Sequence, residues 1–107
     1  MSTEYDKLVR DQIPEIIRRH GDSCEIAIMN QPEYQQALRA KLQEEALEAA
    51  TAHGQALITE LADLYEVMDA LMKSYGIQAD EVKARQAHKR TAYGGFEQRI
   101  RLLRTQP

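Results

Sequence analysis

Apolar and polar positions follow a helical period over most of the chain. From about residue 32 to 53, no glycine or proline follows Pro32, and leucine and alanine recur every three or four residues, a pattern that predicts a helix. A second stretch of this kind runs from about residue 55 to 75 and ends before Gly76. Because only the short segment TAHGQ joins the two, the pattern predicts an antiparallel helical hairpin.

Shorter elements are predicted on both sides of this hairpin. Pro14 suits the start of a short helix and Gly21 lies just past its end, while a third long helix begins near Ala79. Alternating apolar residues predict a short strand near residues 24–29. Residues 96–103 suit strand or helix, and we favour a strand because it can pair with the first. The predicted fold class is mainly α, with these two short strands added.

Carboxylates interrupt the apolar side of both hairpin helices. With Tyr34 at zero and about 100° per residue, Glu45 falls at about 20°, in the middle of the apolar stripe, and Glu48 flanks that stripe at about 320°. On the second helix, counted from its first leucine, Glu60 lies at about 300°, inside the apolar arc, and Asp63 at about 240°, on its edge. These four acids therefore point to the side on which the helices pack.

Three other acids of the hairpin project differently. Glu66 and Asp69 lie near 180° and 120° on the second helix and face away from the first. Glu44 lies at about 280° on the first helix, at the margin of its apolar side. We therefore expect Glu66 and Asp69 to be ordinary surface acids.

Four carboxylates on a packing face require compensating positive charge, since each loses several kcal/mol of hydration on burial. Lys41, at about 340° on the first helix, can form a salt bridge, but one lysine cannot neutralise four acids. Carboxylates at i and i+3 on two antiparallel helices converge, as in helical bundles that hold metal ions. Oxygen ligands favour Mg²⁺, with Mn²⁺ as a substitute. We therefore expect Glu45, Glu48, Glu60 and Asp63 to bind a divalent metal.

Composition narrows the class of protein. A chain of 107 residues with 43% hydrophobic and 29% charged residues predicts a single folded domain over residues 1–107 that also packs against further copies of itself. No apolar run is long enough to span a membrane or to act as a secretory signal, so we expect a cytoplasmic protein. From the short chain we expect a homo-oligomer, either dimer or tetramer.

Charge is distributed unevenly within a net charge of −3. Residues 33–69 contain eight acids and two bases, whereas residues 83–104 contain seven bases and one acid. The basic block is too short and too poor in aromatic residues to indicate binding of a nucleic acid polymer. An acidic centre beside a basic tail does suit a substrate that needs both a cation and phosphate contacts.

The acidic motifs also carry a family resemblance. EEALE (residues 44–48) and ELAD (60–63) resemble the EExxE and ExxD signature of the all-α nucleoside triphosphate pyrophosphatases, the MazG-like and phosphoribosyl-ATP pyrophosphohydrolase-like superfamily. YDKLVRDQIPEII (5–17) and HKRTAYGGFEQRI (88–100) resemble the ends of a small stand-alone house-cleaning branch. The resemblance implies a small MazG-like helical bundle over residues 1–107. It also implies Mg²⁺-dependent hydrolysis of an NTP or dNTP between the α and β phosphates.

Carried over by position, the resemblance implies that Glu45, Glu48, Glu60 and Asp63 bind the metal. Glu44 would be a further member of the motif, which either supports a metal ligand without contacting the metal or acts as the base. Glu48 is our candidate for activating the attacking water. Basic side chains are expected to hold the phosphates, although each of them alone is equally typical of a solvated surface. These candidates are Lys7, Arg10, Lys41, Lys89 and Arg90.

Two alternatives stay open at this point. Phosphoribosyl-ATP pyrophosphohydrolase shares the implied fold and cleaves the same bond, so only the substrate separates it from an enzyme that acts on free nucleotides. A non-catalytic helical module could instead use its acids to bind a basic protein partner. The aromatic residues Tyr65, Tyr75 and Phe96 are candidates for stacking on a base, but such residues more often belong to a core.

Overall fold

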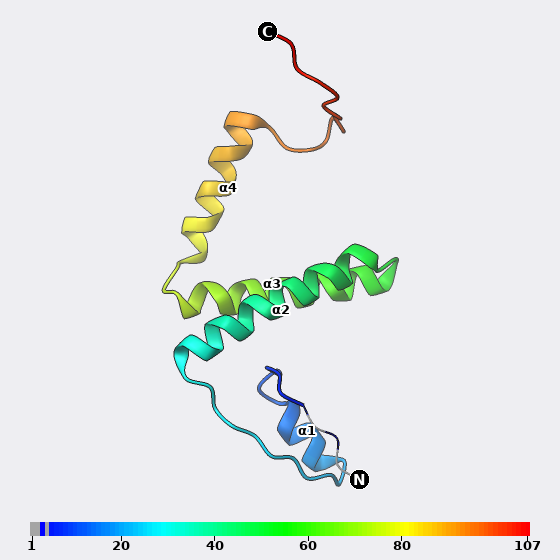
Figure 1. Ribbon diagram of the computed structural model, residues 1–107, viewed down its shortest axis with the longest axis vertical. Coiled ribbons are helices and arrows are strands. Elements are labelled where there is room, and N and C mark those ends of the chain that lie inside the picture. Colours follow the sequence, from blue (N-terminus) through cyan, green and yellow to red (C-terminus); the bar gives the residue numbers. More distant parts are fainter. Residues whose placement is uncertain (1–2, 4) are drawn as a thin grey trace. The chain divides into compact units, whose positions relative to one another are not determined.

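The computed structural model describes residues 3 and 5–107, and these residues form helices but no strand (Figure 1). In chain order the helices are α1 (Ile13–Arg19), α2 (Gln31–Thr51), α3 (Gln55–Ser74) and α4 (Ala79–Tyr93). The chain divides into two units, Met1–Gly76 and Ile77–Pro107, which are described separately. The mainly α class is therefore confirmed, while a single domain over residues 1–107 stays a prediction.

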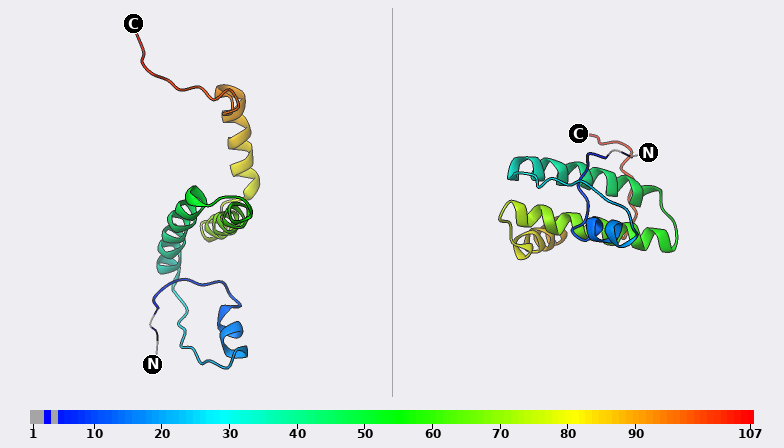
Figure 2. Two further views of the ribbon diagram at one scale, coloured as in Figure 1. Left: turned by 90° about the vertical axis from the view of Figure 1, so that its right-hand side faces the viewer. Right: turned by 90° about the horizontal axis from the view of Figure 1, so that it is seen from below.

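The long helices α2 and α3 pack side by side as the predicted antiparallel hairpin (Figures 1 and 2). At the start of α2, the Asn30 side chain accepts a hydrogen bond from the Glu33 backbone N–H at 3.0 Å, and Glu33 Oε1 accepts one from the Asn30 N–H at 3.1 Å. This reciprocal capping box satisfies two backbone donors that a helix start leaves free. Gly54 joins the helices with a φ of 57°, a backbone angle that favours glycine.

The interior of the hairpin is small. Among the described residues, the buried hydrophobic side chains are Leu38 of α2, 3% exposed, and Val67 of α3, 8% exposed. Glu45 of α2 is buried to the same degree as Val67, with 8% of its surface exposed. A carboxylate therefore occupies one of the few buried positions of this unit, as the helical projection predicted.

The short helix α1 begins with Pro14 in its first turn and has two arginines in its last turn. Proline suits this position because a first-turn N–H has no partner within the helix. Gly21 follows the helix with a φ of 90°. The predicted start and end of α1 are thus confirmed.

The two predicted strands are absent from the described chain, so this part of the prediction is wrong. Neither 24–29 nor 96–103 forms a β-ladder. Ile28 is 89% exposed and Phe96 is 96% exposed. An alternating apolar pattern specifies which side chains share a face, but a strand also needs a neighbour to receive its backbone hydrogen bonds.

The second unit contains α4 and the residues that follow it. The Gln78 backbone N–H donates to Glu81 Oε1 at 3.0 Å at the start of α4, and Gly94 ends the helix with a φ of 88°. Lys89 and Arg90 lie in its last turns. None of the helices described here is both long and apolar enough to cross a membrane.

Candidate metal centre

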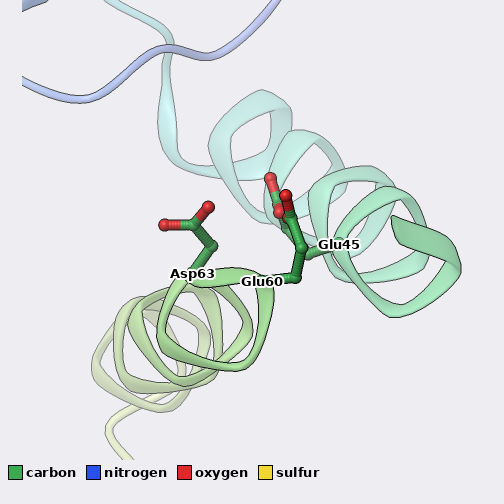
Figure 3. Close-up of side chains that lie close together, drawn as sticks. All are labelled: Glu45, Glu60 and Asp63. Atoms are coloured by element: carbon green, nitrogen blue, oxygen red, sulfur yellow. The ribbon is translucent and has the colours of Figure 1, made fainter. Parts of the chain in front are cut away.

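Three of the four acids predicted to bind metal come together at the α2–α3 seam. Glu45 of α2 and Glu60 and Asp63 of α3 each offer a carboxylate oxygen, and these oxygens all lie within 4.8 Å of one another. Figure 3 shows the three side chains extending from the two neighbouring helices. We call these residues the carboxylate cluster. The spacing of i and i+3 on α3 places Glu60 and Asp63 one turn apart, where both reach the same side of the hairpin.

Two oxygens of the carboxylate cluster are buried without a partner. Glu45 Oε2 and Glu60 Oε2 are inaccessible to solvent and have no hydrogen-bond partner among the described residues. A buried carboxylate oxygen that lacks a donor loses its hydration without replacement, a cost that folded proteins generally avoid. A cation or a proton bound to these two oxygens would therefore stabilise the folded protein.

Two basic side chains supply positive charge to other oxygens of the carboxylate cluster. Lys41 Nζ lies 3.8 Å from Glu45 Oε1, and Arg10 Nη2 donates to Asp63 Oδ1 at 2.8 Å. The first distance is longer than a hydrogen bond. The second pair is solvated, since the side chain of Arg10 is 60% exposed and that of Asp63 35%. Neither base contacts Oε2 of Glu45 or Glu60, so the two buried oxygens stay uncompensated.

Burial and neighbouring carboxylates raise the pKa of Glu45 and of Glu60. Burial raises the pKa of Glu45, with further contributions from the charges of Glu48 and Asp63, while Lys41 acts in the opposite direction. A hydrogen bond shared with Glu48 is the largest of several causes that raise the pKa of Glu60 to about 7. Without a bound cation, Glu60 is therefore only partly ionised at neutral pH.

The other motif acids lie at the edge of this arrangement. Glu48 is exposed, yet it is close enough to Glu60 to raise the pKa of that residue. It is not among the three residues whose oxygens converge within 4.8 Å, so its role as a metal ligand stays a prediction. Glu44 is exposed on α2, and Glu66 and Asp69 are exposed on α3.

An open hollow of about 530 Å³ adjoins the carboxylate cluster. It lies between residues 8–16 and the hairpin, and its lining includes Arg10, Lys41, Glu45 and Asp63. Hollows of this volume accommodate small-molecule ligands. Its lining contains two cationic side chains, Arg10 and Lys41, and four acidic ones, Asp11, Glu45, Asp63 and Glu66. This arrangement suits a ligand that carries negative charge and arrives with a metal ion.

The predicted phosphate-binding residues divide between the two units. Arg10 and Lys41 line the hollow, whereas Lys7 is exposed with its Nζ 5.5 Å from the centre of the Tyr5 ring. Lys89 and Arg90 belong to α4 in the second unit. Arg90 pairs there with Glu97 and holds the pKa of that carboxyl below its usual value.

One contact of this site has no signal in the sequence. Arg10 and Asp63 are 53 positions apart, and no spacing rule connects them. The sequence identified Arg10 as a residue for phosphate and Asp63 as a residue for metal, but their direct ion pair becomes apparent only in the structure.

Comparisons with protein-family models, with curated proteins and with solved structures found no match to this chain.

Proposed function

We propose that this chain is a Mg²⁺-dependent nucleoside triphosphate pyrophosphohydrolase that cleaves an NTP or dNTP between the α and β phosphates. The observation that carries the proposal is the pair of buried, unpartnered oxygens on Glu45 and Glu60, two residues whose carboxyl groups converge with that of Asp63. These oxygens need positive charge, and a divalent ion supplies more of it to one point than Lys41 or Arg10 does.

The donor set suits Mg²⁺ or Mn²⁺. All three residues of the carboxylate cluster offer oxygen, the ligand type that these hard cations prefer, and neither histidine nor cysteine is part of the cluster. When bound, such an ion supplies charge that offsets the negative charge developing on the phosphoryl oxygens. Glu45, Glu60 and Asp63 would hold it, with Glu48 as a further ligand or neighbour.

Glu48 is our candidate for the proton acceptor. It is exposed and close enough to Glu60 to raise the pKa of that residue, so it is near the carboxylate cluster and also accessible to water. Hydrolysis adds the hydroxyl group of water to one phosphorus of the α–β anhydride, the anhydride bond breaks, and Glu48 takes the proton from water. The products are a nucleoside monophosphate and pyrophosphate. Glu44, exposed on the same helix, has a supporting role in this scheme.

Arg10 and Lys41 would bind phosphate oxygens once the substrate is in place. Both line the hollow beside the carboxylate cluster, and both interact with its acids. A bound divalent ion would reduce the negative charge that attracts them to these acids, so they become available to the polyphosphate. Lys7 is a further candidate in this unit.

The proposal agrees with the MazG-like resemblance of EEALE and ELAD. This resemblance also implies a biological role for the activity. An enzyme of this class would act on free nucleotides in the cytoplasm and remove those that should not be incorporated into nucleic acid. Neither the base nor the sugar of the substrate follows from the carboxylates, because these contact only the metal and the phosphate chain.

The test is a screen of ribo- and deoxyribonucleoside triphosphates, with pyrophosphate release measured in Mg²⁺ and in excess chelator. We expect stoichiometric nucleoside monophosphate and pyrophosphate from at least one triphosphate in Mg²⁺ and none in chelator. Phosphoribosyl-ATP is included as a separate substrate. Release of pyrophosphate from that compound alone would show that the substrate is phosphoribosyl-ATP and not a free nucleoside triphosphate. Release of orthophosphate instead of pyrophosphate would show that a different bond is cleaved.

A further inference from the structure

The hollow beside the carboxylate cluster changes in character along the hairpin. The hairpin residues that line it follow one another away from the cluster, in the order Glu45, Lys41, Leu38 and Tyr34 on α2 and Asp63, Glu66, Val67 and Ala70 on α3. With a rise of about 1.5 Å per residue, Tyr34 lies about 16 Å from Glu45 along α2. Ala70 lies about 10 Å from Asp63 along α3. The hollow is therefore charged at the cluster and becomes apolar away from it.

The hollow also has an apolar wall outside the hairpin. The segment that precedes and begins α1 adds four aliphatic side chains to the lining: Leu8, Val9, Ile13 and Ile16. Val9 is 37% exposed and Ile16 38% exposed, so part of this wall is in contact with solvent. A flat apolar group that entered the hollow would remove such surface from water, which favours binding.

Tyr34 is the aromatic side chain in this lining. It is partly buried and lies at the end remote from the cluster, where the small side chain of Ala70 lines the hollow from the other helix. Nucleobases stack on aromatic rings whichever base is bound. The aromatic candidates Tyr65 and Tyr75 do not line the hollow, and Tyr75 accepts hydrogen bonds from Arg39.

Glu66 lies between the charged and the apolar parts of the hollow. It is exposed, lines the hollow, and is not part of the carboxylate cluster. It follows Asp63 by three residues, or about 4.5 Å along the axis of α3. None of the ion pairs of the described chain involves Glu66. Because an ionised carboxylate only accepts hydrogen bonds, this position suits a ligand group that donates them and not a phosphate.

We infer that the hollow binds the nucleoside part of the substrate, with the base against Tyr34 and the 2′-hydroxyl of a ribose donating to Glu66. The inference rests on the proposed function, which places the metal ion and the phosphates at the charged end of the hollow. In a nucleotide the sugar follows the phosphates and the base follows the sugar. Along α3, Glu66 and then the apolar lining follow Asp63 in the same order.

The size and the chemistry of the hollow fit this ligand. Its volume of about 530 Å³ lies in the range of pockets that hold small molecules. Recognition of a ribose 2′-hydroxyl by a carboxylate is also the chemistry that dinucleotide-binding folds use. A 2′-deoxyribose has no donor at this position. The consequence is a preference for ribonucleotides over 2′-deoxyribonucleotides.

Binding of nucleoside 5′-monophosphates to the full chain in Mg²⁺ tests the inference without requiring turnover. The probes are AMP, GMP, CMP and UMP and the 2′-deoxy counterpart of each, and isothermal titration calorimetry gives their Kd values. We expect at least one ribonucleotide to bind, and its 2′-deoxy counterpart to bind at least about 10-fold more weakly, because a hydrogen bond to a charged group is lost.

Glu66→Ala should remove this discrimination. We expect the ribo and 2′-deoxy forms to bind this variant with Kd values within about twofold of each other, since the acceptor for the 2′-hydroxyl is absent. Asp69→Ala is the matched control and should keep the natural ratio, because Asp69 is an exposed acid of the same helix that does not line this hollow. Circular dichroism verifies the helical content of both variants.

Replacement of Tyr34 tests the position of the base. Tyr34→Ala should weaken the binding of ribo and 2′-deoxy forms alike, on the order of 10-fold, because stacking is lost. Tyr34→Phe should retain the natural affinity, because the ring alone stacks. If Tyr34→Ala does not fold, nuclear Overhauser contacts between the protons of the bound base and the Tyr34 ring in the natural protein test the same point. Their absence would contradict the assigned position.

The outcomes separate this inference from the proposed hydrolase activity. Equal affinity for each ribonucleotide and its 2′-deoxy form, or a ribose preference that Glu66→Ala leaves unchanged, would overturn the inference even if triphosphates are hydrolysed. The failure of all eight monophosphates to bind would also overturn it. A ribose preference that depends on Glu66, without pyrophosphate release from any triphosphate, would support this site and contradict the hydrolase.

Discussion

Glu45, Glu60 and Asp63 lie at the α2–α3 seam. Glu66 and Asp69 are exposed on α3 and stand outside the carboxylate cluster, although Glu66 lines the adjoining hollow. The two groups have the same chemistry, and on α3 they are separated by only a few positions. At the seam, two carboxylate oxygens are buried without a partner and the pKa of Glu60 is raised to about 7. This difference shows that the direction of an acid relative to the packing face, and not the density of acids in the sequence, identifies a candidate metal ligand.

The largest expected effect is on catalysis. Glu45→Gln should lower the rate of pyrophosphate release by more than about 100-fold, since even the residues that only support a metal ligand are worth 10–100-fold. Asp69→Asn should change it by less than about twofold, because this side chain is exposed on α3 and does not line the hollow beside the cluster. The measurement is kcat/KM on the best triphosphate of the screen. Equal losses in the two variants would show that the seam has no special role.

The next effect is on stability in the presence of metal. A ligand that binds only the folded form raises the unfolding free energy by about 2.7 kcal/mol at 100 times its Kd. We expect this gain for the natural protein in Mg²⁺ and for Asp69→Asn, and a much smaller gain for Asp63→Asn. Chemical denaturation with and without Mg²⁺ measures it. A natural protein whose stability is unchanged by Mg²⁺ would favour a non-catalytic interaction module.

The third effect is the pH dependence of the metal-free protein. The pKa of Glu60 is raised in the folded state from 4.5 to about 7, so the folded form binds more protons than the unfolded form between these values. The contribution of this residue to stability is present below about pH 4.5 and is lost as the pH rises through about 7.

Denaturation of Glu60→Gln between pH 5 and pH 8 tests the direction of this pH dependence. We expect its unfolding free energy to fall less from pH 5 to pH 8 than that of the natural protein, in the absence of divalent metal. Asp69→Asn should retain the natural slope. A natural protein whose stability increases over this range without metal would contradict the assigned direction.

The smallest expected effect on stability comes from removing the Arg10–Asp63 ion pair. Solvated ion pairs contribute about 0–1 kcal/mol, and Arg10 is 60% exposed, so Arg10→Gln should change the unfolding free energy by less than about 1 kcal/mol. We expect its main effect to be a raised KM for the triphosphate, with Arg18→Gln of α1 as the control. An unchanged KM would remove Arg10 from the phosphate-binding residues.

The hairpin was predictable because its rules are local. Pro32 and Gly54 fix where the helices begin and end, and the 3.6-residue period determines which side chains share a face. The same projection placed Glu45 in the interior and Glu66 and Asp69 outside, which agrees with their exposure.

Features that depend on distant segments were not predictable in this way. Strands at 24–29 and 96–103 required a pairing partner that an alternating pattern cannot specify. The contact between Arg10 and Asp63 depends on how residues 8–16 meet the hairpin. Likewise, the influence of Glu48 on the pKa of Glu60 depends on the separation of α2 and α3, which the angular projection of each single helix does not contain.

Titration of the protein with Mn²⁺, followed by the electron paramagnetic resonance signal of the free ion, tests the central claim most directly. We expect the natural protein and Asp69→Asn to bind Mn²⁺ with the same affinity, Mg²⁺ to compete for the same site, and Glu45→Gln to bind at least about 10-fold more weakly. If the natural protein and Glu45→Gln bind Mn²⁺ equally, or if neither binds it, the carboxylate cluster does not hold a divalent metal.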